Sequence, residues 1–320
     1  MRILVTGGSG FIGTNLVEHL VWRGFEVVNV DCRPPLKATQ RAWWAKCDIQ
    51  DLVDVIAVFR DFRPDAVVHL AARTDSFGRN VGDYQINVVG TRNMVIASAR
   101  QSRVSRVVTV STQYVHGPSH LPEHDQDFEP VNAYGQSKVA AEKETRYGGL
   151  TCTWTIARPT NIWGPWHPRY PREIWRYLSR GVYFHPGGGR VVRCYGYVKN
   201  VVHQLEQILI AAPSAVHARV FYLGDPPVEL TVWVNAFSRA LCGRDVCTIP
   251  RGFLRMVARA GDVLTSIGVS FPLHSSRFRS MTEDYLAPMA PTFEAFGLPP
   301  VSLEKGVAET VSWLREQGFA

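Results

Sequence analysis

A glycine-rich turn that joins a predicted strand to a predicted helix is the strongest constraint on this chain of 320 residues. The apolar run 2–6 leads directly into Gly7-Gly8-Ser9-Gly10-Phe11-Ile12-Gly13, and a helical pattern follows over 12–23. Such glycines let the backbone approach a pyrophosphate, while the N–H groups at the helix N-terminus face the anion. The spacing therefore predicts a dinucleotide site that includes Gly7, Gly10, Phe11, Ile12 and Gly13.

An acidic residue ends the second predicted strand, at the place where a dinucleotide site of this kind needs one. Asp31 stands 18 residues after Gly13, and its carboxylate is placed to accept hydrogen bonds from the adenosine ribose. The same negative charge repels a 2′-phosphate, so the sequence predicts NAD rather than NADP. Arg33, two residues later, works against this preference.

Short β-branched runs alternate with helix-length segments in the first half of the chain. The predicted strands are 2–6, 26–31, 66–70, 106–111 and 153–158, with a late one at 220–224, and predicted helices include 12–23, 51–62, 87–101 and 303–317. This alternation is typical of a parallel sheet covered on both faces. We therefore expect an α/β fold, with a doubly wound parallel (Rossmann) sheet over 1–160 and a smaller, mostly C-terminal substrate-binding lobe over 161–320.

Composition excludes several classes of protein. The chain is 46% hydrophobic and 20% charged, which is ordinary for a globular protein. Its six cysteines form no C-x-x-C pair, so we expect neither a disulfide framework nor a metal site, and reduced thiols favour the cytoplasm. The first residues lack the long apolar run and cleavage site of a signal peptide, and no run of about 18 apolar residues occurs, so neither a signal peptide nor a membrane span is expected. The apolar residues between Phe253 and Phe271 recur at helical spacing, which predicts a helix packed on the body of the protein.

The net charge of +7 lies mostly in the second half, where residues 161–320 carry 17 basic and 12 acidic side chains. There is no basic run and no aromatic–basic repeat, so we do not expect nucleic acid as a partner. Arginines placed for a small diphosphate ligand explain the excess.

The glycine turn and several later segments resemble the extended short-chain dehydrogenase/reductases, in particular their nucleotide-sugar epimerase/dehydratase group. The matching segments run over nearly the whole chain, beginning with T-G-G-S-G-F-I-G. The resemblance implies that Asp48 and Ile49 contact adenine and that Leu70, Ala71 and Ala72 lie along the cofactor. It also implies that Asn87 opens the family's N-x-x-G-T helix beside the cofactor and that Arg73 contacts the substrate.

The family's catalytic Tyr-x-x-x-Lys pair occurs twice, at Tyr134/Lys138 and at Tyr195/Lys199. Tyr134 opens a strongly helix-forming stretch, where positions i and i+4 share one face, so the Lys138 ammonium can lie near the Tyr134 hydroxyl. This charge would favour the phenolate and let Tyr134 act as a general base, with both residues beside the cofactor. Tyr195 and Lys199 lie in an extended-looking segment that would hold their side chains about 10 Å or more apart. We therefore predict Tyr134 and Lys138 as the catalytic pair.

A hydroxyl that helps the tyrosine is expected at the end of the strand 106–111. By resemblance, Thr112 is the catalytic residue that hydrogen-bonds the reacting sugar hydroxyl and the substrate, and Ser111 is a cofactor or structural neighbour. Relatives that are 4,6-dehydratases carry acidic residues directly afterwards, because eliminating water needs a carboxyl acid and base. This chain has Gln113 and Tyr114, so dehydration is disfavoured.

The resemblance also implies a set of substrate residues. Asn161 lies in R-P-T-N-I-W-G-P, which resembles the family's R-x-x-N-x-Y-G-P, and Arg193 ends G-G-G-R-V-V-R, which matches the family's diphosphate-binding segment. A planar guanidinium suits that anion. Arg277 is a further candidate, and a surface salt bridge is the alternative role for either arginine.

These features together predict an NAD-dependent epimerase that inverts carbon 4 of a nucleotide-diphosphate sugar. A reductase of 4-ketosugars on the same Thr-Tyr-Lys site is the first alternative, and a non-catalytic dinucleotide-binding protein is the second. Dimers of this family usually form through two helices, here 83–101 and 134–146, so a homodimer is expected. The charged Lys143, Glu144 and Arg146 leave a small or weak interface as the alternative.

Overall fold

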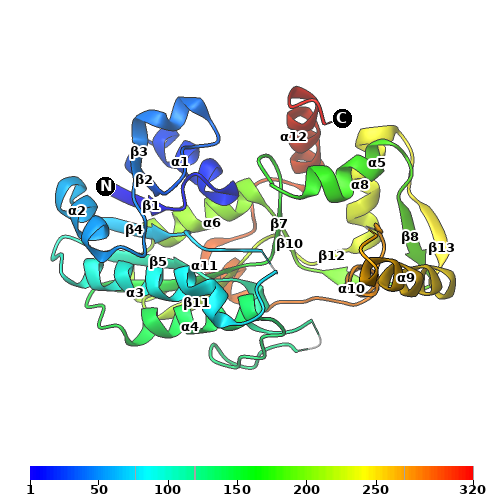
Figure 1. Ribbon diagram of the computed structural model, residues 1–320. Coiled ribbons are helices and arrows are strands. Elements are labelled where there is room, and N and C mark those ends of the chain that lie inside the picture. Colours follow the sequence, from blue (N-terminus) through cyan, green and yellow to red (C-terminus); the bar gives the residue numbers. More distant parts are fainter. Residues whose placement is uncertain (76, 119, 270, 320) are drawn as a thin grey trace. The chain divides into compact units, whose positions relative to one another are not determined.

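The computed structural model describes residues 1–75, 77–118, 120–269 and 271–319 (Figure 1). These residues form two compact units, each of which is described by itself. The first unit comprises Met1–Ile162, Gly196–Asp225 and Ala287–Pro300. The second unit comprises Trp163–Tyr195, Pro226–Leu286 and Val301–Ala320.

The first unit is built on a seven-stranded parallel sheet with the order β11-β6-β5-β4-β1-β2-β3. The strands are β1 (Arg2–Thr6), β2 (Glu26–Asp31), β3 (Trp44–Lys46), β4 (Ala66–His69), β5 (Arg106–Val110), β6 (Thr153–Pro159) and β11 (Arg219–Leu223). Strand order reverses between β1 and β4. In an open parallel sheet, ligands bind beyond the carboxyl ends of the strands at such a reversal.

Helices cover the sheet in two sets. Helices α2 (Leu52–Phe62), α3 (Gln85–Ala99) and α4 (Ala133–Tyr147) pack side by side, while α1 (Phe11–Trp22) packs with α6 (Val198–Ile210) (Figure 1). The short helices are η1 (Ala38–Trp43), η2 (Val81–Tyr84), η3 (Gln113–Val115), α7 (Pro213–Val216) and α11 (Ala290–Phe296). Strand residues such as Leu4, Val67 and Val107 pack against Phe59 of α2 and Met94 of α3 in one apolar core. These observations confirm the predicted doubly wound α/β fold.

The second unit contains short strand pairs and several helices. Strands β8 (Phe184–Gly187) and β13 (Cys247–Pro250) pair in parallel, and β9 (Val192–Arg193) and β12 (Val228–Glu229) pair antiparallel. The helical segments are η4 (Pro171–Trp175), α5 (Arg176–Ser179), α8 (Leu230–Cys242), α9 (Arg251–Ser266), α10 (Ser275–Ser280) and α12 (Leu303–Glu316). Trp163, Trp175, Trp233 and Phe237 form an aromatic core. The chain first passes from the first unit to the second within β7 (Asn161–Trp163) and returns within β10 (Tyr195–Tyr197). It crosses again after Asp225, Leu286 and Pro300.

Several element ends differ from their predicted positions by one or two residues. The strands expected over 66–70 and 106–111 end at His69 and Val110, because the next residues already belong to the loops beyond the carboxyl edge. The helix expected from Asn87 begins at Gln85, where it continues directly from the 3-10 turn η2. Strand β3 was not predicted, since three residues at the edge of a sheet carry too little alternation to recognise.

Candidate functional site

The glycine turn after β1 is packed too closely to accept other side chains at two positions. Gly7 has φ +69°, and a Cβ there would lie 2.7 Å from the backbone nitrogen of Ala71. A Cβ on Gly13 would lie 2.1 Å from the carbonyl oxygen of Gly7. The N-cap residue of α1 is Gly10, which has no side chain of its own to cap the helix. The turn therefore places a helix N-terminus at the strand-order reversal, which fits the phosphates of a dinucleotide.

Asp31 connects the end of β2 to this turn. Its side chain is 8% exposed, and its two oxygens accept hydrogen bonds from the backbone nitrogens of Ser9, at 3.2 Å, and Arg33, at 2.9 Å. The carboxylate is thus fixed beside the glycine turn. This position fits the ribose-binding role that the sequence predicts for Asp31.

A buried histidine, His69, connects the end of β4 to β1 and to α3 by hydrogen bonds. His69 at the end of β4 has its Nδ1 2.7 Å from Thr6 Oγ1 of β1, and its Nε2 3.0 Å from Thr91 Oγ1 of α3. Burial, followed by the charge of Lys138, lowers the pKa of His69 to about 3, so the ring is neutral at physiological pH. Thr6 Oγ1 also accepts a hydrogen bond from the backbone nitrogen of Ala71. The predicted cofactor segment Leu70, Ala71 and Ala72 is therefore anchored next to Gly7.

The segment expected to contact adenine is held by α3. Asn93 donates hydrogen bonds of 2.9 Å to the carbonyl oxygens of Ile49 and Gln50, and Gly90 leaves room for the Ile49 side chain. Ile49 belongs to the apolar core, and the Asp48 carboxylate accepts from the backbone nitrogen of Gln50. Asp48 and Ile49 thus lie in a loop whose backbone is held by hydrogen bonds from α3.

Asn87 on α3 and the loop after β4 hold one another. The side-chain oxygen Oδ1 of Asn87 accepts from the backbone nitrogen of Arg73. Its side-chain Nδ2 donates to the backbone carbonyl of Arg73 and to Ser137 Oγ on α4. The Arg73 guanidinium forms a two-point pair with Asp75 and donates to the Asp83 carbonyl. Both side chains are therefore engaged within the protein, and the ligand contacts expected of them stay predictions.

Tyr134 and Lys138 lie one turn apart on α4, as the spacing predicts. Lys138 is 2% exposed, and its Nζ donates a 2.7 Å hydrogen bond to the carbonyl oxygen of Val110 at the end of β5. Burial lowers the pKa of Lys138 to about 8, an effect that nearby Glu142 opposes, so the ammonium is charged at neutral pH. The half-buried Tyr134 ring packs between those of Tyr84 and Tyr114, with centroids 6.0 and 6.2 Å away.

The residues after β5 place two hydroxyl groups near the Lys138 anchor. Ser111 Oγ is buried and has no hydrogen-bond partner among the described residues. Thr112 is 6% exposed, and its Oγ1 accepts a 3.3 Å hydrogen bond from the backbone nitrogen of Tyr114. Because a buried hydroxyl without a partner is costly, Ser111 fits a place beside a bound polar group. Gln113, the first residue after Thr112, is fully buried.

A buried ion pair that the sequence did not predict fixes α4 to the sheet. Glu142, one turn beyond Lys138, accepts hydrogen bonds of 2.9 and 2.8 Å from the guanidinium of Arg158 on β6. Arg158 also donates to Tyr222 Oη on β11 and to the Asp125 carbonyl. Both charged side chains are at most 1% exposed. The signal available was an acid at the fourth position after Lys138 and an arginine inside an apolar strand.

The expected substrate residues fall in different parts of the chain. Asn161 is a half-buried residue of β7 in the first unit, whereas Arg193 and Arg277 belong to the second. Arg193 is 6% exposed and donates to the carbonyl oxygens of Ser280 and Glu283, and its guanidinium lies over the Tyr285 ring. Arg277 donates to the Pro272 carbonyl and lies 3.6 Å from Glu173.

The second Tyr-x-x-x-Lys pair, Tyr195 and Lys199, does not lie on one helix. Tyr195 on β10 stacks on Trp233 with a centroid distance of 4.6 Å and an interplanar angle of 7°. Lys199 stands in the first turn of α6, after the strand has ended. Tyr195 and Lys199 therefore do not share one helix face, and Tyr134 and Lys138 do.

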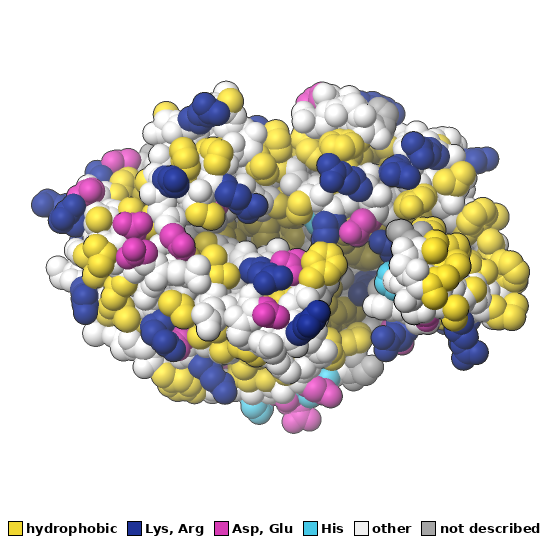
Figure 2. All heavy atoms as spheres, viewed as in Figure 1, with side chains coloured by type: hydrophobic (Ala, Val, Ile, Leu, Met, Phe, Trp, Pro, Cys, Tyr) yellow, Lys and Arg dark blue, Asp and Glu magenta, His cyan; other side chains and the backbone are white. Residues whose placement is uncertain are grey.

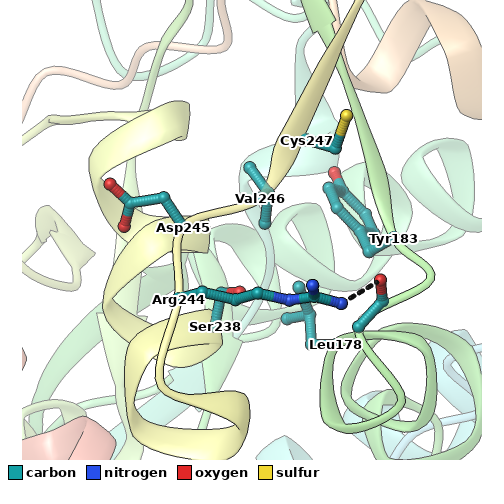
Figure 3. A pocket seen from close by; sticks show the side chains of 8 residues that line it. Leu178, Tyr183, Ser238, Arg244, Asp245, Val246 and Cys247 are labelled. Carbon is teal, nitrogen blue, oxygen red and sulfur yellow. Dashed lines mark hydrogen bonds between the residues drawn. The ribbon is translucent and has the colours of Figure 1, made fainter.

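Neither of two cavities in the second unit has a predicted site residue among the described residues that line it. One, of about 270 Å³, is bordered by Tyr183, Ser238, Arg244 and Cys247, and Arg244 crosses it to donate to the Gly181 carbonyl (Figure 3). The other, of about 570 Å³, is a groove between α8 and α12. Within the described ranges, no three His, Cys, Asp or Glu side chains are grouped to hold a metal ion. Nor is any helix there long and apolar enough to cross a membrane.

Comparison with known proteins places the chain in a family. Residues 3–224 match the model of the "NAD dependent epimerase/dehydratase family". A 3-beta-hydroxysteroid dehydrogenase of Mycolicibacterium neoaurum is 33% identical over 221 residues, which are 63% of this chain and 59% of that protein. An N-acetyl-alpha-D-glucosaminyl-diphospho-ditrans,octacis-undecaprenol 4-epimerase of Escherichia coli O157:H7 is 30% identical, and the match covers 75% of this chain and 72% of that one. The chain spans 53–59% of the length of several curated relatives, which include dTDP-D-glucose 4,6-dehydratases.

Solved structures share the fold over the whole chain. A UDP-glucose 4-epimerase from Thermotoga maritima superimposes with a TM-score of 0.75 at 22% identity, and the match covers 99% of both chains. At this identity the likeness concerns the fold alone. The family model covers more than half of the chain. The chain therefore belongs to the NAD-dependent epimerase/dehydratase family of extended short-chain dehydrogenase/reductases, and NAD is its cofactor.

Proposed function

We propose that this protein is a nucleotide-sugar epimerase that inverts carbon 4 through a 4-keto intermediate. The observation that carries the proposal is the arrangement around β5 and α4: a tyrosine and a buried lysine on one helix face, with hydroxyls following the strand to which that lysine is bonded. Bound NAD would supply the hydride acceptor and donor for carbon 4.

Tyr134 is the proposed general base and acid. Its phenolate oxygen would take the proton from the sugar's 4-hydroxyl as carbon 4 is oxidised, and the resulting hydroxyl would return that proton as the hydride comes back. Thr112 Oγ1 would hydrogen-bond the same sugar hydroxyl and hold it toward Tyr134. The keto sugar must present its other face before it is reduced, so the net reaction inverts carbon 4 and consumes no dinucleotide.

Lys138 is proposed to set the charge that the tyrosine experiences. Its Nζ is held by the Val110 carbonyl, which is neutral, so the ammonium keeps its full positive charge beside the site. A fixed cation of this kind favours the phenolate form of Tyr134. The lysine would also orient the cofactor, beside the Ser111 hydroxyl.

Arg193 is proposed to bind the diphosphate of the substrate. Its guanidinium is buried, yet its partners are two carbonyl oxygens and an aromatic ring, and no carboxylate within 4.0 Å pairs with it in the part of the chain that the structure describes. Its Nε is buried without a partner among the same residues. A buried cation without a counter-ion is costly, so an anionic ligand would stabilise it. Asn161 and Arg277 are proposed as further substrate contacts.

Epimerisation is favoured over dehydration by the residues after Thr112. A 4,6-dehydratase must remove the 6-hydroxyl and the 5-proton, which requires a carboxyl acid and base. Relatives of this chain include dTDP-glucose 4,6-dehydratases, but here the two positions are Gln113 and Tyr114. A ketosugar reductase would use the same Tyr134 site and would consume reduced dinucleotide.

The proposal is tested by NMR of the purified protein with NAD against UDP-, GDP-, dTDP- and CDP-sugars. We expect one of these sugars to yield its 4-epimer without net change in reduced dinucleotide. The panel should include a polyprenyl-diphosphate sugar, because one relative is named as an epimerase of such a substrate. Absence of any epimer across the panel would refute the proposal, and oxidation of reduced dinucleotide by a ketosugar would assign the reductase instead.

Asp31→Ala should weaken NAD binding about tenfold or more and relax the discrimination against NADP. The variant removes both the charge that repels a 2′-phosphate and an acceptor for the ribose hydroxyls, and hydrogen bonds to charged groups contribute about 1.5–3 kcal/mol. Calorimetric titration with NAD and NADP measures both effects. Asp61→Ala, at an exposed carboxylate on α2, is the control and should leave both affinities unchanged. An unaltered preference in Asp31→Ala would show that another residue reads the ribose.

We also propose a homodimer through the outer faces of α3 and α4. These helices pack against each other, and Val88, Val89, Ile96, Val139 and Ala140 are half-buried on them. Arg92 and Glu144 form an exposed ion pair between the two helices. Light scattering should give about twice the chain mass of 35.8 kDa, and a monomer at micromolar concentration would refute the dimer.

A further inference from the structure

Helix α9 of the second unit has one packed face and one apolar face that is open. Leu254, Ala258 and Gly261 are buried, and the first two contact Phe278 of α10 in a small core. The sequence predicts a helix packed on the body, and this face fulfils that expectation. The opposite side carries large apolar side chains that the same packing leaves in solvent.

The open apolar side chains form one straight stripe. Phe253 is 53% exposed, Met256 62%, Val263 63% and Ile267, which caps the helix, 69%. With the exposed Ala260 between them, these positions are alternately three and four residues apart, so they share one face. The stripe is about 21 Å long, from the 14 steps between Phe253 and Ile267 at a rise of about 1.5 Å each.

A row of arginines lies along one side of this stripe. Arg251, Arg255 and Arg259 recur every fourth residue, and Arg255 lies over the Phe278 ring while Arg251 donates to the Gly189 carbonyl. The one acidic residue of α9, Asp262, is hydrogen-bonded to the backbone and hydroxyl of Ser275. Figure 2 shows hydrophobic side chains gathered over this part of the molecule, with basic side chains around them.

The charge of the whole chain is concentrated in the same unit. Its residues include 15 Lys and Arg against 9 Asp and Glu, whereas the first unit has 20 against 19. The second unit therefore carries +6 of the net charge of +7. A partner that covers the open face of α9 must therefore offer both an apolar region and negative charge.

We propose that α9 docks this protein on the surface of an anionic lipid bilayer. The helix lies parallel to the membrane, the stripe enters the boundary between headgroups and acyl chains, and the exposed Arg255 and Arg259 reach the phosphates. Anionic headgroups neutralise the row of arginines, and acyl chains cover the apolar stripe. A second copy of the chain would satisfy the stripe but would bring two rows of arginine together, which repel.

The test is co-sedimentation of the purified protein with lipid vesicles. We expect binding to phosphatidylcholine vesicles that contain about one third phosphatidylglycerol, weaker binding to phosphatidylcholine alone, and a decrease with added salt. Met256→Gln/Val263→Gln should reduce the affinity for the anionic vesicles about tenfold or more, because both side chains would lose their place in the acyl region. Both residues are exposed, so the variant should keep the circular dichroism spectrum and melting temperature of the wild type.

The matched control is Val53→Gln/Leu298→Gln, which replaces two side chains of similar exposure in the first unit and should bind as the wild type does. Arg255→Gln/Arg259→Gln should remove the preference for anionic vesicles. Three results would overturn the proposal: no binding of the wild type to the anionic vesicles, equal binding by Met256→Gln/Val263→Gln and the control, or a dimer that only the α9 variant disrupts. None of these results bears on the sugar chemistry, which is measured without vesicles.

Discussion

Tyr134→Phe should lower kcat about 100- to 10,000-fold while NAD remains bound, which is the range that a positioned general base contributes. The substitution removes only the hydroxyl oxygen, and the ring keeps its contacts with Tyr84 and Tyr114. The sugar's 4-hydroxyl then has no group to accept its proton, although Lys138 stays bonded to the Val110 carbonyl. Turnover is measured by NMR, and NAD content by absorbance after denaturation. Together they distinguish a loss of proton transfer from a loss of bound cofactor.

The matched control for this variant is Tyr147→Phe on the same helix. Tyr147 is 69% exposed and its hydroxyl contacts Gln126, so its loss should leave kcat within about twofold of the wild type. Near-normal turnover in Tyr134→Phe would transfer the role of base to another residue. Loss of bound NAD in that variant would instead show that the tyrosine acts through the cofactor site.

Glu142→Gln should reduce the free energy of unfolding by about 3–5 kcal/mol. The glutamine has the same shape, but it leaves the guanidinium of Arg158 buried and without a counter-charge, and breaking a buried pair costs this amount. The pair joins α4 to β6, so the loss also loosens the helix that carries Tyr134 and Lys138. Urea unfolding followed by far-ultraviolet circular dichroism measures the change.

Glu144→Gln provides the comparison that separates burial from charge. It lies on the same helix and pairs with Arg92, whose side chain is half exposed, and such surface pairs contribute under about 1 kcal/mol. If both variants lose similar stability, the Glu142–Arg158 pair is not the buried anchor described above. Glu142→Gln/Arg158→Met should recover part of the loss, since it also removes the unpaired guanidinium on β6, while Arg146, 3.9 Å from Glu142, lacks that carboxylate in both variants.

The sheet and the cofactor turn were predictable because each rests on a local pattern. Alternation of β-branched runs with helical segments gives the parallel order, and Gly7 and Gly13 follow from turns that admit no Cβ. The Tyr134/Lys138 pair was predictable because four-residue spacing on a helix places both side chains on one face. Resemblance to the family added residues such as Asp48 and Asn87, for which no local rule exists.

Contacts between residues far apart in the sequence were not predictable in the same way. The His69 ring connects Thr6 and Thr91, and Glu142 meets Arg158, only because the sheet order brings these segments together. The open face of α9 also escaped prediction. Its periodicity indicates a helix, but periodicity does not show which side of the helix is covered.

The fate of a deuterium at carbon 4 of the nucleotide sugar tests the central proposal most directly. With NAD present and ordinary water as solvent, an epimerase with the proposed mechanism removes and returns the same hydrogen. We therefore predict an epimerised product that retains deuterium at carbon 4, with no hydrogen from solvent there and no net consumption of dinucleotide. Deuterium delivered to carbon 6, or product formed only with stoichiometric oxidation of reduced dinucleotide, would contradict the account.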